Sequence, residues 1–173
     1  DFNFSAVSGM NNAVSAGVLS GRPFGGVGFL WNKSLNNQMS FIKGDPEGRC
    51  LVYKLTVRNR SILLINVYLP CCDNSIEYKN EINFYAAFIV DVLESVNHTD
   101  VIIMGDFNFE FEDGRYGYTV FKPMLQRFDL NVCTDNKNPT YCNESLNYSS
   151  CIDHFVVSTD IKQCRQVFTI IDS

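Results

Sequence analysis

The sequence has 173 residues, 46% of them hydrophobic and 19% charged, and a formal net charge of −5 at pH 7. This length suits a single domain with its own core, and the composition is too apolar for a disordered chain. Its apolar runs are far shorter than the ~20 residues that cross a bilayer, and no signal peptide is visible. A pI near 4.9 is far from that of a protein that binds nucleic acid through a basic surface.

The seven cysteines do not follow the spacing of a zinc site or of a disulfide framework. No two of them form a Cys-x-x-Cys pair, and an odd number leaves one thiol over. We therefore expect reduced cysteines in an intracellular protein. The alternative is a secreted glycoprotein, which is favoured only by six Asn-x-Ser/Thr sequences. These sequences begin at Asn3, Asn32, Asn59, Asn97, Asn143 and Asn147.

The first half of the chain is typical of β-structure. Four runs rich in β-branched and aromatic residues are separated by Gly, Asn and Asp turn signals, and their short connections predict an antiparallel meander. The predicted strands are Phe24–Trp31, Met39–Lys43, Cys50–Val57 and Ile62–Leu69.

The hydrophobic period then changes from that of a strand to that of a helix. Apolar residues at i, i+3, i+4 and i+7 predict a helix over 77–96, capped by Asn74 or Ser75. The later elements are a strand at Asp100–Met104, a helix at Thr119–Phe128, and strands at Ile152–Val157 and Gln166–Ile171. This order indicates an α/β layered sandwich and not a doubly wound parallel sheet.

Gly105-Asp106-Phe107-Asn108 is the first candidate for chemistry, because it follows a short buried strand. Asp offers a hard oxygen ligand or a proton acceptor, and the Asn amide can bind phosphate oxygen. Residues two apart on an extended segment point to the same side. The structural alternative is an Asx turn that ends the strand.

Two further strands carry polar residues where apolar ones are expected. Asn66 and Tyr68 lie near the end of Ile62–Leu69, and the tyrosine hydroxyl could donate to a phosphate or be the wet tip of a core residue. Asp153 begins the apolar run Ile152–Val157, where a carboxylate is costly without a partner.

Together these blocks resemble the endonuclease/exonuclease/phosphatase superfamily in their order and spacing. The matching segments are Asn66-Val-Tyr68-Leu-Pro70, Gly105-Asp106-Phe107-Asn108 and Ile152-Asp153-His154-Phe-Val-Val-Ser158. The stretch Gly21–Trp31 is similar to the branch found in non-LTR (LINE-type) retrotransposons, and the resemblance covers nearly all of residues 1–173. It implies an incomplete four-layer α/β sandwich of the DNase I-like type.

The resemblance also implies an activity and its partners. The domain would cut DNA phosphodiesters in the nucleus with Mg²⁺ or Mn²⁺, beside a reverse transcriptase that is C-terminal in the same polyprotein. Tyr68 would contact the scissile phosphate, with Asn66 nearby as a second substrate-binding residue. Asp106 would hold the metal and activate the attacking water or handle the proton of the leaving oxygen. Asn108 would keep the phosphate in line, and Asp153 would orient a catalytic histidine.

Two departures from the pattern concern the ends of the chain. The metal-binding glutamate of the family has no counterpart before Gly21, and its closing Ser-Asp-His has none up to Ser173. We therefore expect little or no catalysis from these residues alone. His154 is not a replacement, because it is adjacent to Asp153 on a strand and the two side chains point to opposite faces.

The remaining polar candidates have ordinary explanations. Glu110, Glu112 and Asp113 suit a solvated acidic loop, although they could add negative potential near a cation. We expect His98 to be solvated, and Arg22 to be either a phosphate contact or a surface residue. Gly25 and Gly26 would let two strands approach closely.

Three other functions remain open from the sequence. The chain could belong to a phosphoinositide phosphatase or an mRNA deadenylase of the same superfamily. It could also be a catalytically dead remnant that serves as a binding module.

Overall fold

The centre of the molecule is a six-stranded sheet with the order β3-β4-β5-β6-β10-β7. The computed structural model describes residues 1–9, 25–133 and 139–163. The strands of this sheet are β3 (Met39–Gly44), β4 (Cys50–Val57), β5 (Arg60–Tyr68), β6 (Asp100–Asp106), β7 (Leu130–Val132) and β10 (Asp153–Ser158). Only β5 and β6 pair in parallel, and the other neighbours are antiparallel. The chain crosses from β5 to β6 through α2 (Ile76–Ser95).

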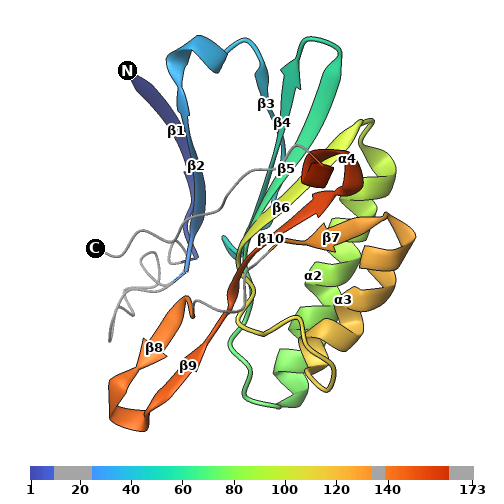
Figure 1. Ribbon diagram of the computed structural model, residues 1–173. Coiled ribbons are helices and arrows are strands. Elements are labelled where there is room, and N and C mark those ends of the chain that lie inside the picture. The colour runs from blue at the N-terminus through green and yellow to red at the C-terminus, as the bar shows by residue number, and fades with distance from the viewer. Residues whose placement is uncertain (10–24, 134–138, 164–173) are drawn as a thin grey trace.

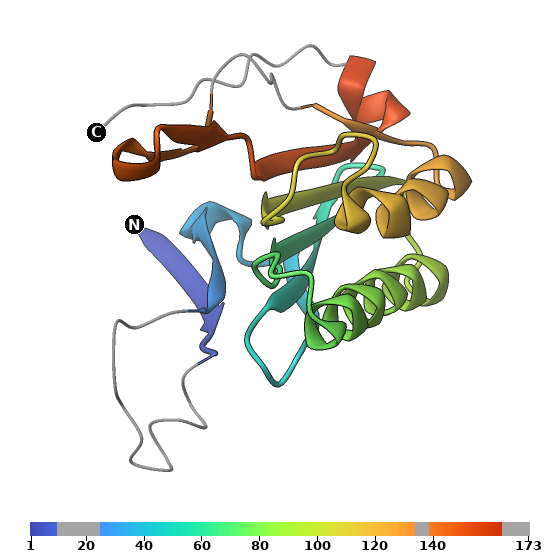
Figure 2. The same cartoon turned by 90° about the horizontal axis from the view of Figure 1, so that it is seen from below.

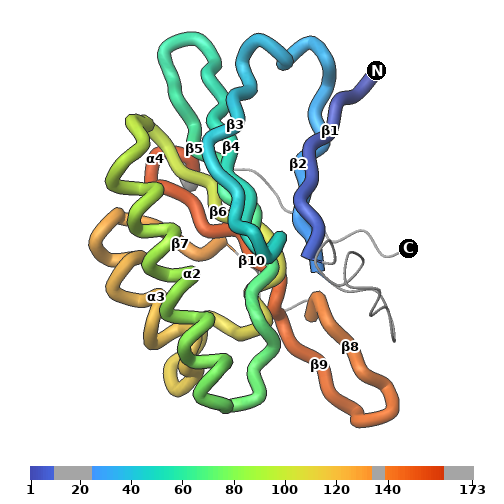
Figure 3. The backbone as a smooth tube through the Cα atoms, turned by 180° about the vertical axis from the view of Figure 1, so that it is seen from behind, coloured from blue at the N-terminus to red at the C-terminus, as the bar shows by residue number. Residues whose placement is uncertain are grey.

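Two further layers lie on opposite sides of this sheet (Figure 1). Helices α2 and α3 (Tyr116–Arg127) cover one face, and the ribbon of β1 (Phe2–Val7) and β2 (Val27–Asn32) covers the other. Views from below and from behind give the same arrangement (Figures 2 and 3). The small hairpin of β8 (Tyr141–Asn143) and β9 (Tyr148–Ser150) projects beyond the start of β10, and a short helix, α4 (Thr159–Gln163), follows the end of that strand.

Helix α2 forms where the sequence predicts it. Ser75 is its N-cap, with the Ser75 side chain accepting a hydrogen bond from Tyr78 N at 2.9 Å. The buried side chains follow the helical period and include Ile82, Ile89 and Leu93. The α2 prediction is therefore confirmed, and the cap is Ser75.

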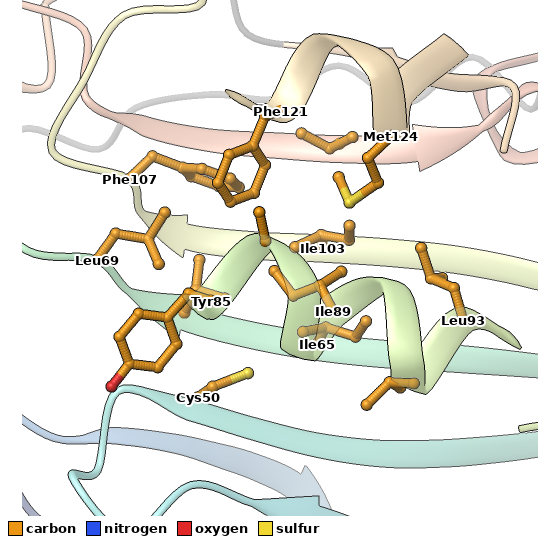
Figure 4. Close-up of a cluster of buried hydrophobic side chains, with 14 of the residues drawn as sticks. Cys50, Ile65, Leu69, Tyr85, Ile89, Leu93, Ile103, Phe107, Phe121 and Met124 are labelled. Carbon is orange, nitrogen blue, oxygen red and sulfur yellow. The ribbon is translucent and has the colours of Figure 1, made fainter. Parts of the chain in front are cut away.

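The larger core lies between the helices and the sheet. Ile65 of β5 and Ile103 of β6 pack there against Ile89 of α2 and Phe121 of α3 (Figure 4). All four side chains are fully buried. At about 1.5–3 kcal/mol for each buried large side chain, this core is the main stabilising contribution to the fold.

A second, smaller core joins the β1–β2 ribbon to the sheet. The Tyr53 ring of β4 contacts Phe29 and Trp31 of β2, in both cases with ring centroids 5.5 Å apart. Val27 and Leu51 complete this cluster, and both are buried. Alternate residues of β2 therefore face the sheet, as expected for layers packed face to face.

The predicted four-strand meander is partly wrong. Strands β3, β4 and β5 do form a meander, but β2 lies in another layer and pairs with β1, which the sequence analysis did not predict. The alternation of apolar residues in β2 correctly indicates a strand with one buried face. It does not indicate whether that strand joins the sheet edge or packs on its surface.

Other boundaries shift by a few residues. Helix α3 begins at Tyr116 instead of Thr119, and the three-residue strands β7, β8 and β9 were not predicted. Strand β10 matches the predicted Ile152–Val157 within one residue at each end. The predicted strand Gln166–Ile171 lies outside the described residues, as does Arg22.

Within the described part of the chain, no helix is long and apolar enough to span a membrane. In the same part, no two cysteines are joined by a disulfide.

Candidate active site

Three neighbouring strands bring Tyr68, Asp106 and Asp153 together at one end of the sheet. The parallel register pairs Tyr68 with Asp106, and the antiparallel register pairs Asp106 with Asp153. Residues that lie level on adjacent strands point to the same face. That face is the one turned toward the β1–β2 ribbon, because Tyr68 packs against the smaller core.

Gly105 is the residue that allows β6 to end in this way. Its φ of +128° is unfavourable for residues with a side chain. A Cβ at this position would lie 2.0 Å from the carbonyl oxygen of Val67. The neighbouring Phe107 is fully buried in the larger core and anchors the turn. Asp106 thus lies between two fixed neighbours: Gly105, which packs closely on the backbone of β5, and Phe107, whose ring is buried.

Asp106 is half-buried and beside another carboxylate. Its Oδ1 accepts a hydrogen bond from the backbone N of Asn108 at 2.8 Å. Burial raises the pKa of Asp106 to about 6; the hydrogen bond from Asn108 opposes this rise, and the charge of Asp153 adds to it. The carboxyl group can therefore exchange a proton near neutral pH or bind a cation that relieves the repulsion.

Asn108 closes the turn after β6 and is also a candidate site residue. The strand ends at Asp106, and Asn108 has a left-handed φ of 54°, so the alternation argument used for its direction does not apply. Its Nδ2 donates to the carbonyl oxygen of Leu69 at 2.7 Å, and its Oδ1 accepts from Cys71 Sγ at 3.3 Å. The Asx turn is present, and the amide ties the loop after β6 to the loop after β5.

Asn66 lies one step further inside the sheet, on the same face as Tyr68. Its Nδ2 donates to the carbonyl oxygen of Gly28 at 2.7 Å, which links β5 to the β1–β2 ribbon. Gly25 approaches the Tyr68 ring, since a Cβ at Gly25 would lie 3.9 Å from Tyr68 Cε1. Asn66 thus holds the two layers together beside the site.

Asp153 and His154 point to opposite faces, as the sequence predicts. Asp153 is exposed, and its backbone N donates to Thr140 Oγ1 at 3.0 Å. His154 is only 2% exposed and packs against Phe111 with a centroid distance of 4.8 Å. Its Nε2 lies 2.9 Å from the carbonyl oxygen of Phe109, and burial lowers its pKa. His154 is a core residue on the helix side.

The acidic loop after Asn108 is largely neutralised by local cations. Glu110 pairs with Arg115 at 2.9 Å, and Asp113 pairs with Lys122 at 3.0 Å. His98 lies before β6, at the end of the strand away from Asp106, with its Nδ1 2.7 Å from the carbonyl oxygen of Val96. These residues do not contribute to the row on β5, β6 and β10.

A pocket of about 400 Å³ adjoins the row at Asn108. Its wall combines the loop after β5, the loop before α3 and the β8–β9 hairpin. The lining residues are Cys71, Cys72, Asn74, Tyr78, Asn108, Phe109, Glu110, Arg115, Tyr116, Tyr141, Tyr148, Ser150 and Ile152. The sequence analysis did not predict this pocket, because its aromatic residues come from three separate segments.

The Asp106–Asp153 pair also bears on the expected Mg²⁺ or Mn²⁺ site. Within residues 1–9, 25–133 and 139–163, no cluster of three or more His, Cys, Asp or Glu side chains could hold a metal ion. Mg²⁺, however, often binds through one or two carboxylates, with waters and phosphate oxygens as its other ligands. Two level carboxylates, one with a raised pKa, fit that limited ligand set.

Comparisons with known proteins identify a family and a shared fold. The family described as endonuclease-reverse transcriptase matches residues 62–173, which include β5 from Ile62 onward and all of β6 and β10. No curated protein sequence matches the chain.

Several solved structures share the fold. The endonuclease domain of TRAS1, a telomere-specific non-LTR retrotransposon, superposes with a TM-score of 0.58 and 17% identity, covering 80% of this chain and 62% of that domain. The 3′ phosphatase NExo from Neisseria, solved with a product DNA hairpin, gives 0.55 and 16%, covering 92% and 68%. The human Nocturnin catalytic domain gives 0.58 and 10%, covering 91% and 61%. The chain therefore spans about 62% of the TRAS1 domain.

Proposed function

The chain belongs to the endonuclease-reverse transcriptase family, and from that membership we propose that it is part of a DNA-nicking endonuclease domain of a non-LTR (LINE-type) retrotransposon. Its fold is a mixed α/β fold of the DNase I-like type. The observation that carries the proposal is the row of Tyr68, Asp106 and Asp153 on one face of β5, β6 and β10.

Each residue of the site has a role that its surroundings support. Asp106 would hold the cation, and its raised pKa suits it to accept or donate a proton at the oxygen that Asn108 N does not occupy. The hydroxyl of Tyr68 donates to the scissile phosphate, and Asn108 keeps that phosphate in line through the N–H that Leu69 does not use. In the full-length domain Asp153 would orient a catalytic histidine, and Asn66 ties β5 to the β1–β2 ribbon beside Tyr68.

A bound Mg²⁺ or Mn²⁺ ion would supply the positive charge that a phosphodiester needs during hydrolysis. The residues of this chain would exclude water on the β1–β2 side and set the direction of the phosphate. We propose that the 173 residues alone cut weakly, because the described histidines face away from the row.

Charge also bears on the proposal. A net charge of −5 predicts weak and salt-sensitive binding to DNA. A reverse transcriptase in the same polyprotein would compensate, since a tether raises the local concentration of DNA at the site. Action in the nucleus follows from the proposed substrate.

The test is nicking of supercoiled plasmid by a chain extended to the full length of its relatives. We expect Mg²⁺-dependent nicking that falls by at least about 100-fold in Asp106→Ala, because the metal ligand and proton-transfer group are lost together. Asp91→Ala is the control, because Asp91 is exposed on α2 and pairs only with Lys43 at 3.0 Å among the described residues.

Other outcomes favour other functions. Hydrolysis of a phosphoinositide or of an RNA 3′ end without plasmid nicking would support a different member of the superfamily. No activity on any phosphodiester, with no effect of divalent metal on stability, would support a catalytically dead binding module.

A further inference from the structure

The face that carries the site extends to the residue directly before β4. The antiparallel register pairs Cys50 with Val67, and one step further Tyr68 N donates to the carbonyl oxygen of Arg49 at 2.8 Å. Leu51 follows Arg49 by two residues and faces the β1–β2 ribbon, so Arg49 shares that face. The row therefore contains Tyr68, Asp106 and Asp153 on three strands and Arg49 directly before β4. Strands are about 4.8 Å apart, so the backbone at Arg49 is roughly 10 Å from that at Asp106.

The Arg49 side chain is directed by Tyr68. Its guanidinium lies over the tyrosine ring, with Cζ 5.3 Å from the ring centroid. Its Nη1 also donates to the carbonyl oxygen of Tyr68 at 3.3 Å. The cation is therefore stacked on the residue that we assign to the scissile phosphate.

A buried carboxylate fixes the backbone that leads to Arg49. Asp45 is only 4% exposed, and its Oδ1 accepts from Arg49 N at 2.7 Å and from Cys50 N at 2.5 Å. Its other oxygen accepts from the Tyr85 hydroxyl at 3.0 Å, which ties this turn to α2. Gly48 has a φ of +68° and packs directly on the backbone of Gly9. Arg49 thus starts from a turn that is tied to both neighbouring layers.

Arg49 also lacks a carboxylate partner among the described residues. Six ion pairs are present there, and none involves Arg49. A half-buried guanidinium without a counter-ion, in a chain of net charge −5, is suited to an external anion. Guanidinium groups match phosphate well, because their planar N–H donors can bind two oxygens at once.

We propose that Arg49 binds the nucleic-acid phosphate next to the one held at Asp106, with Tyr68 as its stacking surface. This inference rests on the proposed function, since it assigns Arg49 to the same substrate. The row then has a carboxylate end for the cation and a guanidinium end for the neighbouring phosphate. Phosphate contacts of this kind fix the position of the strand without reading its bases.

The test is the salt dependence of binding to a fluorescent DNA duplex, measured by anisotropy with the 173-residue chain. The plot of log K against log salt has a negative slope, and each lost phosphate contact makes that slope less steep by about 0.9. We expect Arg49→Gln to make the slope less steep by about that amount, with an unchanged melting temperature. Arg49→Lys should keep the slope, because the charge remains, and bind more weakly, because the flat stacking group is lost.

Arg58→Gln is the matched control. Arg58 is exposed in the turn between β4 and β5, at the end of these strands away from Tyr68, and it makes no ion pair among the described residues. Its replacement should leave the slope unchanged.

The outcomes separate this inference from the proposed function. An unchanged slope in Arg49→Gln, or a loss of affinity that only follows a fall in melting temperature, would overturn the role of Arg49 alone. Failure of the unmodified chain to bind DNA at low salt would overturn the role of Arg49, whereas the proposed function is overturned only if the extended chain does not nick plasmid. A third outcome is that Arg49→Gln makes the slope less steep, while Asp106→Ala does not change nicking by the extended chain. This outcome would support the role of Arg49 and reject the chemistry assigned to Asp106.

Discussion

At the scale of single residues, the site brings acidic groups together at a cost in stability. Asp106 is half-buried and level with Asp153, so two like charges lie on neighbouring strands. Gly105 makes this placement possible, because any larger residue would collide with the backbone of β5. The combination is typical of a functional site, where local strain and repulsion are kept because the rest of the fold compensates.

The pKa of Asp106 predicts a pH-dependent change in stability. The folded value of about 6 is above the ordinary value of 3.8, so the folded state binds the proton more tightly. The stabilisation of the folded state by this group is therefore fully present below about pH 4 and is lost as pH rises through about 6. We expect Asp106→Asn to melt at a higher temperature than the unmodified chain at neutral pH, with the difference shrinking toward pH 4.

Thermal melts across that pH range, without divalent metal, measure the effect. Asp153→Asn is the control, because Asp153 is exposed and its replacement should change stability less at the same pH. A melting-temperature difference for Asp106→Asn that does not vary with pH would contradict the assigned cause.

At the scale of elements, local signals decide where α2 begins, and α2 connects β5 to β6. Ser75 caps the helix, and Asp73 Oδ1 accepts from Ser75 N at 2.9 Å in the turn before it. The crossover through α2 then returns the chain to β6 in parallel with β5. Because parallel strands end at the same edge, Tyr68 and Asp106 meet there.

Loss of the cap should weaken the protein measurably. We expect Ser75→Ala to lower the free energy of unfolding by about 1 kcal/mol, since Tyr78 N loses its hydrogen-bond acceptor. Ser95→Ala, at the exposed last residue of α2, should change it by less than about 0.5 kcal/mol. Urea unfolding of both variants makes the comparison, and equal losses would mean that Ser75 does not act as a cap.

At the scale of the whole molecule, the β1–β2 ribbon is held mainly by one aromatic cluster. Its outward residues Phe2, Phe4 and Leu30 are 62%, 78% and 71% exposed, so among the described residues nothing covers that side. Its inward residues pack on Tyr53 of the sheet. The ribbon therefore depends on this contact to stay over the site.

Removal of the Tyr53 ring should release the ribbon before the rest of the fold. Truncation of a buried aromatic residue costs about 3–5 kcal/mol, and here the lost contacts lie between two layers. We expect Tyr53→Ala to reduce amide-exchange protection in β1 and β2 more than in β5 and β6. Tyr141→Ala, which truncates a more exposed ring in β8, should leave all four strands protected. Uniform loss of protection in Tyr53→Ala would show that the layers unfold together.

The sequence by itself determined the features that depend on periodicity and local turn chemistry. It predicted α2, the strands β5, β6 and β10, the turn at Gly105–Asn108 and the opposite directions of Asp153 and His154. These follow from rules that act over a few residues.

Only the tertiary structure decided which strands are neighbours and in what register. It placed β2 in a separate layer with β1, brought Arg49 level with Tyr68, and assembled the pocket at Asn108 from three segments. Periodicity shows which side of a strand is buried, but not which strand or layer lies against it. That choice depends on the packing of side chains far apart in the chain, and it is this packing that turns separate motifs into one row of functional groups.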